Sequence, residues 1–118
     1  MDNYLLYKTL SITPMVDDTI VLNKPFVYKD ITVPEGFVSD GITMPKYLRP
    51  LLSMFSVSRF KPSYLPAVVI HDYLCDLEMY EKADKYFEEI LYSVEKTVVT
   101  KSMVLAVKEY HKFRYNTK

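Results

Sequence analysis

The stretch AVVIHDYLCDLEMYEKADKYF, residues 67–87, contains an apolar run, a short polar break and a second run of mixed character. The apolar run predicts one helix over 64–76. Ala83, Phe87, Ile90 and Leu91 recur with helical spacing, which predicts another helix over 80–95. The break around Glu78 is short enough to turn the chain back on itself. We therefore expect a hairpin of two antiparallel helices at the centre of the fold.

Three polar residues lie on the seam of this hairpin. Asp72 and Asp84 are each six positions from Glu78, so they would meet across the seam, and His71 is one position farther. Because successive helical residues are rotated by about 100°, His71 and Asp72 cannot both face the partner helix squarely, but they can converge around one edge of it. The sequence thus predicts a cluster of His71, Asp72 and Asp84.

This cluster is suited to two kinds of chemistry. A carboxylate beside an imidazole can fix its tautomer, raise its basicity and let His71 activate water. Two carboxylates with a histidine could also hold a metal ion. A buried histidine satisfied by an acid on a neighbouring helix is the structural alternative, and spacing alone favours it. Cys75 lies on the same face and could pair with the imidazole, although a structural cysteine is more common.

The first forty residues are typical of strands. Stretches rich in β-branched and aromatic residues cover 5–12, 19–28 and 30–40, and they predict two or three antiparallel strands. The Pro-Glu-Gly sequence at 34–36 fits a type I turn, with Pro in its second and Gly in its fourth position. This turn is expected to bend or interrupt the third stretch.

The remainder of the chain is expected to be helical. Both glycines lie within 35–45, which predicts a shaped loop. A short helix should follow over 45–55, and a last helix over 98–113. The fold class is therefore α+β: a small N-terminal antiparallel sheet of two to three strands, then a bundle of three to four helices around the central hairpin. We expect one domain, mainly β over 1–40 and mainly α over 41–118.

Composition and charge argue against several classes of protein. The chain has 118 residues, 49% of them hydrophobic, which suits one globular domain. Its 15 basic residues balance 15 acidic ones, which argues against a general polyanion-binding protein, although 71–95 is acidic and 96–118 is basic. A single cysteine excludes an intrachain disulfide. We expect no signal peptide and no membrane span.

Three ordered motifs resemble a known family. They are VPEGFVSDGITMP at 33–45, YLPAVVIHDYL at 64–74 and KADKYF at 82–87. In this order they are similar to the small phage and prophage proteins of the domain-of-unknown-function family thirteen fifty-three, over about residues 31–110. The sequence at 41–43 is Gly-Ile-Thr where Gly-Ala-Ser is more usual, which keeps a hydroxyl. The resemblance carries over these motif residues: Gly36, Asp40, Thr43, Pro45, His71, Asp72, Ala83, Asp84 and Phe87.

The resemblance implies a phage-type origin and a shared polar cluster. Asp40 and Thr43 are the polar landmarks of the shaped loop, so we expect this loop to fold over the hairpin and bring Asp40 close to His71. Asp40 then becomes a further catalytic candidate, and Gly36 and Thr43 become loop or substrate-binding candidates. Alternatively, Asp40 and Thr43 only cap backbone groups at the start of the short helix.

Three acids around one imidazole would carry an electrostatic cost. Such crowding would raise the pKa of at least one carboxyl group or require a cation. A divalent cation could bind at Asp40, Asp72 and Asp84, and no other cofactor is expected.

A fainter similarity is to the helical core of secreted and viral phospholipases A2. In those enzymes a histidine activates water, the next aspartate binds calcium and a distant aspartate orients the histidine, an arrangement similar to His71, Asp72 and Asp84. This chain departs from them because it lacks a glycine-rich calcium loop and a disulfide pair. Cys75 also stands where the viral enzymes usually carry Tyr, and the helix separation is short. Local convergence is our preferred explanation.

Three function classes follow from the sequence. The preferred one is a non-enzymatic phage or prophage protein, a virion or assembly component or a host-interaction factor with a protein partner. Its 11 tyrosines and the tail KEYHKFRYNTK would suit a contact surface. The alternative is a small esterase, phosphoesterase, amidase or phospholipase-like hydrolase with His71 as general base and Asp40 or Asp84 as its partner. Nucleic-acid binding through the basic tail is third, because the net charge is balanced. We expect the protein in the host cytoplasm or the virion.

Overall fold

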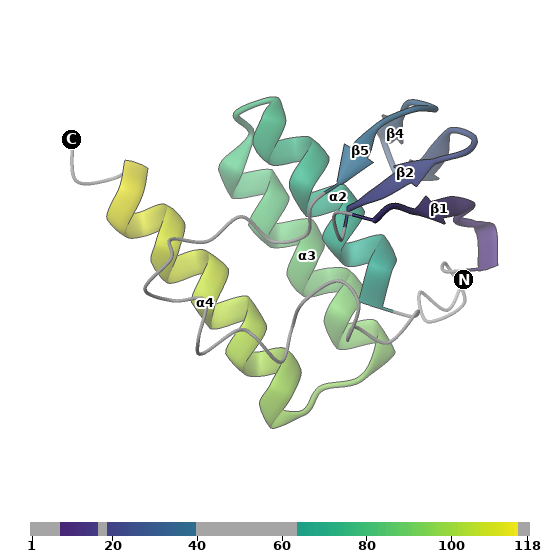
Figure 1. Ribbon diagram of the computed structural model, residues 1–118. Helices are drawn as coiled ribbons and strands as arrows, with labels where there is room; N and C mark the ends of the chain where they lie inside the picture. Colours follow the sequence, from purple (N-terminus) through teal and green to yellow (C-terminus); the bar gives the residue numbers. More distant parts are fainter. Residues whose placement is uncertain (1–7, 17–18, 40–63, 116–118) are drawn as a thin grey trace.

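The computed structural model describes residues 8–16, 19–39 and 64–115, with strands in the N-terminal part and helices in the C-terminal part (Figure 1). This arrangement confirms the predicted α+β class. The short helix predicted over 45–55 and the loop that carries Asp40 lie outside the described residues. Of the helices in the described part, none is long and apolar enough to cross a membrane.

Within the described residues, five short strands form two antiparallel sheets. In the first, β2 (Ile20–Leu22) lies between β1 (Ile12–Pro14) and β5 (Val38–Ser39). The second is a hairpin of β3 (Phe26–Tyr28) and β4 (Ile31–Val33). Alternate residues of β3 and β4 are buried, as expected for strands with one face on a core and the other in water.

The first predicted strand, over 5–12, is wrong in its bounds. Residues 8–9 form a helical turn, and pairing with β2 begins at Ile12 and continues to Pro14. Proline is tolerated there because β1 lies at the edge of its sheet. The bounds of this strand thus follow from its pairing with β2 and not from the local composition.

The second predicted strand, over 19–28, is interrupted at Asn23. The N–H of Asn23 donates to the carbonyl of Ser11 at 2.8 Å, and its Oδ1 accepts from the hydroxyl of Thr13 at 2.7 Å. These bonds hold the end of β2 against β1. Pro25 follows and has no N–H to continue a ladder, so the chain starts a new strand, β3.

The third predicted strand, over 30–40, is interrupted at the Pro-Glu-Gly sequence as expected, but the turn type differs. The N–H of Phe37 donates to the carbonyl of Pro34 at 3.2 Å, so Gly36 is the third residue of the turn and not the fourth. Its φ of 86° is the conformation that a type II turn requires in that position. Gly36 therefore provides a left-handed backbone conformation that other residues adopt at a cost.

Three helices follow over residues 64–115, and the predicted helix hairpin is confirmed. They are α2 (Leu65–Asp76), α3 (Tyr80–Val94) and α4 (Val98–Tyr115). Helix α2 packs on α3 and also on β4 and β5, and α3 packs on α4 (Figure 1). Consistent with this central place, α2 is buried around most of its surface, and Pro66 occupies its first turn, where no N–H is needed.

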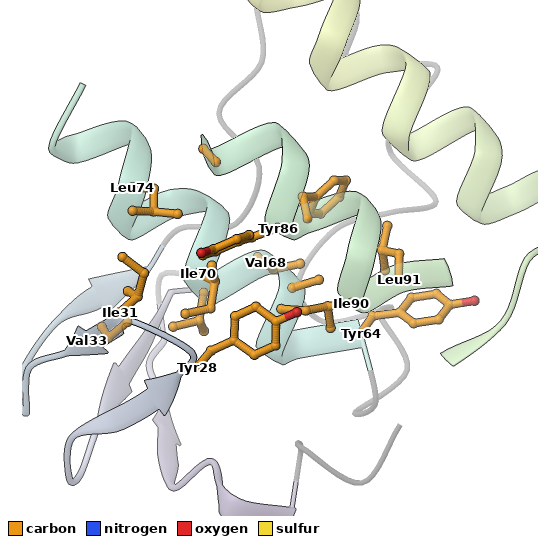
Figure 2. Close-up of a cluster of buried hydrophobic side chains, with 14 of the residues drawn as sticks. Tyr28, Ile31, Val33, Tyr64, Val68, Ile70, Leu74, Tyr86, Ile90 and Leu91 are labelled. Carbon is orange, nitrogen blue, oxygen red and sulfur yellow. The ribbon is translucent and has the colours of Figure 1, made fainter. Parts of the chain in front are cut away.

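Much of the core lies between the β3–β4 hairpin and the two central helices, and it extends to Leu22 of β2 and Met103 of α4. Figure 2 shows Ile31 and Val33 of β4 directed toward Ile70 of α2, with Tyr28 of β3 near Tyr86 of α3. The rings of Tyr28 and Tyr86 meet edge to face, with centroids 5.2 Å apart. The sheet residues thus pack against the same helix pair whose seam carries the polar cluster.

Hydrogen bonds also fasten the turn between β3 and β4 to α3. Lys82 and Tyr86 both donate to the carboxylate of Asp30, the latter at 2.7 Å. The bond from Lys82 and then that from Tyr86 lower the pKa of Asp30 from 3.8 to about 2. Beside them, Lys29 and the Tyr28 hydroxyl donate to Glu89 at 2.6 and 2.9 Å. These contacts hold the hairpin on the helix that carries Asp84.

The Asp30 contacts predict an acid-sensitive part of the stability. Because the folded state lowers this pKa, the stabilisation is complete above about pH 4 and is lost as the pH falls through about 2. We expect the free energy of unfolding, measured with urea between pH 2 and 5, to fall less steeply for Asp30→Asn than for the wild type. Tyr86→Phe keeps the ring but loses one hydrogen bond, so its slope should be intermediate. Parallel curves for all three proteins would contradict this prediction.

Candidate functional site

The turn between α2 and α3 lies where the sequence predicted it. Glu78 has a φ of 61°, in the left-handed region, and its N–H donates to the carbonyl of Cys75 at 2.9 Å. The N–H of Met79 donates to the carbonyl of Leu74 at 2.9 Å. These are the bonds of a Schellman-like helix end, with glutamate in the position that glycine usually occupies. The turn brings the last turns of α2 against the first turns of α3.

His71 and Asp84 meet across this seam. The Nε2 of His71 lies 2.9 Å from Oδ1 of Asp84, and their side chains are only 3% and 13% exposed. The ring of Phe87, one helical turn after Asp84, lies with its centroid 4.9 Å from that of the imidazole at a tilt of 54°. The predicted contact of His71 with Asp84 is confirmed, and the imidazole is held by a carboxylate at one nitrogen and by an aromatic ring on one side.

Cys75 lies beside the imidazole of His71. Its Sγ is 3.7 Å from Nδ1 and 3.9 Å from Nε2. Burial is the main cause that raises the pKa of the thiol from 9.0 to about 12, and the charges of Asp84, Asp72 and Asp76 raise it further. The group is therefore a neutral thiol, which can donate its S–H to an imidazole nitrogen but is a poor nucleophile at neutral pH. This favours the structural cysteine over a reactive thiol–imidazole pair.

The neighbours of the imidazole together indicate its tautomer. In neutral histidine one nitrogen carries a proton and the other accepts. A carboxylate at Asp84 only accepts, so Nε2 carries the proton and donates to it. In this neutral form Nδ1 is the nitrogen that accepts.

We predict that Cys75 reacts slowly with alkylating agents in the folded protein. A pKa of about 12 in place of 9.0 lowers the thiolate fraction at pH 8 by roughly 10³-fold, and half-burial limits access as well. Iodoacetamide labelling, followed by mass spectrometry, should be at least about 100-fold slower in the folded protein than in urea. Labelling at similar rates would mean that the thiolate forms readily and would revive a nucleophilic role for Cys75.

The other predicted site residues differ in what the structure says of them. Asp72 is buried on α2, and its charge acts on the Cys75 thiol, whereas its predicted contact with Asp84 stays a prediction. Gly36 lies in the turn before β5 and shapes that loop. Asp40 and Thr43 lie outside the described residues, so their approach to His71 also stays a prediction.

The structure tests the predicted cation site only in part. Among residues 8–16, 19–39 and 64–115, no group of three His, Cys, Asp or Glu side chains is placed to hold a metal ion. The proposed ligand set included Asp40, which is not in these ranges. Two features of the site were missed in the sequence: the ring contact of Phe87 with His71 and the influence of Asp76 on Cys75. The three-residue spacing of Asp84 and Phe87 could have indicated the first of them.

Comparison with known proteins gives one match. A family model described as "Protein of unknown function (DUF1353)" matches residues 15–107, which span β2 to most of α4 and include the whole helix hairpin. No curated protein and no solved structure matches the chain. The matched family is the one that the three sequence motifs resemble.

Proposed function

The chain belongs to the DUF1353 family of proteins of unknown function, and we propose that it is a small hydrolase in which His71 activates water and Asp84 orients His71. The observation that supports this proposal is the 2.9 Å contact between Nε2 of His71 and Oδ1 of Asp84. A carboxylate in this position fixes the tautomer of the imidazole and stabilises the imidazolium that forms when it accepts a proton. The contact of Phe87 would keep the ring in place during this step.

The proposed reaction is the hydrolysis of an ester or amide by water. Nδ1 of His71 takes a proton from water while the water oxygen forms a bond to the carbonyl carbon. The imidazolium then gives this proton to the leaving oxygen or nitrogen as its bond to the carbonyl carbon breaks. Asp84 stays a carboxylate throughout and accepts the hydrogen bond from Nε2. Water is consumed, an acid and an alcohol or amine are released, and no redox change takes place.

The test is a substrate screen with a variant that lacks the base. His71→Gln keeps an amide that can donate to Asp84 but cannot take up a proton. With p-nitrophenyl esters of short and long acids and an anilide, we expect turnover by the wild type and a loss of at least about 100-fold in the variant. His111→Gln, which changes the other histidine of the chain, is the matched control and should keep wild-type activity.

Two results would overturn the hydrolase proposal. One is the absence of turnover by the wild type on every substrate of the panel. The other is equal turnover by the wild type and by a folded His71→Gln protein. Circular dichroism and urea unfolding would establish that the variant is folded.

We also propose a second candidate, a non-enzymatic phage or prophage accessory protein that binds a protein partner in the virion or the host. It is favoured by valines on the outward faces of the strands: Val27 of β3 is 57% exposed and Val38 of β5 is 52% exposed. Apolar side chains of this kind are typical of contact surfaces when they gather on one face. If this candidate holds, Val27→Ser and Val38→Ser should weaken assembly with a virion or host protein, whereas His71→Gln should not. The hydrolase proposal predicts instead that His71→Gln lowers turnover and that Val27→Ser and Val38→Ser leave it unchanged.

A further inference from the structure

Large apolar side chains are exposed in two places among the helical residues whose side chains the structure describes. At the turn between α2 and α3, Leu77 is 49% exposed and Met79 is 38% exposed. On α4, Val98 is 80% exposed and Leu105 is 60% exposed. The two places are separate, because α4 lies on the side of α3 away from the strands, whereas the turn closes one end of the α2–α3 pair (Figure 1).

The surface at the α2–α3 turn is acidic as well as apolar. Asp76, Glu78 and Glu81 are all exposed around the two apolar side chains. Within residues 8–16, 19–39 and 64–115, none of these three carboxylates has a hydrogen bond or an ion pair. Lys82, the next residue along α3, binds Asp30 of the β3–β4 turn. We call Asp76, Leu77, Glu78, Met79 and Glu81 the turn surface.

The outer face of α4 carries the opposite charge. Val98, Lys101, Leu105 and Lys108 follow one another at spacings of three and four residues, so they form one stripe along the helix. All four are exposed, although Lys108 also forms an ion pair with α3. Glu109 is exposed beside the last of them. Lys101, between the two apolar side chains, is therefore the cation best placed to meet an acidic and apolar partner surface.

From these two surfaces we infer that the protein binds a second copy of itself, with the turn surface of one copy on the outer face of α4 of the next. Apolar side chains meet apolar side chains in this contact, and the carboxylates of the turn surround Lys101. The chain has a net charge of +0 at pH 7, so no overall repulsion between copies opposes it. The inference is independent of the proposed hydrolase function.

The position of the two surfaces also determines the kind of assembly. They are different patches of one chain, so the contact between copies is heterologous. Each bound pair keeps one turn surface and one α4 face free, and these can bind further copies. The expected product is therefore a series of oligomers that lengthens with concentration, and not a closed two-fold dimer.

Sedimentation velocity of the full chain tests this assembly. The contact involves few side chains, so we expect weak binding, with a Kd on the order of 100 μM. The average mass should rise beyond that of a dimer as the protein concentration is raised from about 10 μM to about 1 mM at low salt. It should fall again in about 0.5 M NaCl, because salt screens the attraction between Lys101 and the carboxylates.

Exchanging the charges shows which surfaces meet. Glu78→Lys and Lys101→Glu each place like charges in contact, and each should weaken the association at least about 10-fold. The double variant restores the pairing with its charges exchanged and should recover most of the wild-type association. Glu35→Lys and Lys24→Glu make the same two changes at exposed positions outside both surfaces, and they should associate like the wild type.

Three results would overturn the inference. The first is a wild type that stays monomeric at every concentration in low salt. The second is association that stops at a dimer, which indicates a two-fold contact of one surface with itself. The third is a double variant that associates no better than the two single variants, which would mean that Glu78 and Lys101 do not meet between copies. Circular dichroism of each variant would establish that it is folded.

Discussion

Replacing Phe87 with alanine is expected to lower the free energy of unfolding by about 3–5 kcal/mol. The side chain is fully buried on α3, and its ring lies against the imidazole of His71. Alanine would leave a cavity between α2 and α3, because the helices on either side are fixed by their other contacts. The measurement is urea unfolding followed by circular dichroism, with the midpoint and the slope determined separately.

Two further variants control this prediction. Phe87→Leu fills much of the volume and should cost clearly less than Phe87→Ala. Val98→Ala, at a position 80% exposed at the start of α4, should change the free energy of unfolding by no more than about 0.5 kcal/mol. If Phe87→Ala cost as little as Val98→Ala, the packing of the seam around His71 would not be the one described here.

The helices were predictable because each carries its own signal. The apolar spacing within 80–95 and the polar break at Glu78 placed α3 and the hairpin turn to within one residue. Helix α2 is buried around most of its surface and has little amphipathic pattern, yet its apolar run indicated it. Local signals, periodicity for α3 and an apolar run for α2, were therefore sufficient for these elements.

The strands were less predictable because their ends depend on partners distant in the sequence. Asn23 ends β2 through bonds to Ser11 and Thr13, about ten residues away. Lys29 takes a φ of 52° in the turn between β3 and β4, although no glycine or asparagine marks that position. Its ammonium binds Glu89 of α3, sixty residues later, a contact that no local pattern in the sequence indicates.

The contact of His71 with Asp84 could be predicted from the sequence, but the electrostatics around Cys75 could not. Equal spacing from Glu78 placed Asp84 opposite Asp72 with His71 one position farther, and the structure confirms the contact of His71 with Asp84. The raised pKa of Cys75 depends on burial and on three carboxylates whose distances from Sγ are set by the packed hairpin. No spacing rule indicates the degree of that burial.

Asp84→Asn is expected to lower hydrolytic turnover by roughly 10²- to 10⁴-fold while the protein stays folded. The amide can turn its NH2 group toward Nε2 of His71, so the short contact is kept with its direction reversed. Nε2 then accepts, and the proton of the neutral imidazole moves to Nδ1. The nitrogen that should take a proton from water no longer has a lone pair, and the imidazolium has lost its carboxylate.

This substitution distinguishes a catalytic pair from a structural one because it has a readout that does not depend on substrate. Nitrogen-15 NMR of the labelled protein should show His71 with its proton on Nε2 in the wild type and on Nδ1 in Asp84→Asn. Asp84→Glu, which retains the charge, should restore part of the turnover and the original tautomer. Full turnover in Asp84→Asn, despite the reversed tautomer, would mean that Asp84 only stabilises the helix hairpin and that His71 is not the base. Loss of turnover together with the tautomer change, in a folded protein, is the result that a general base at Nδ1 requires.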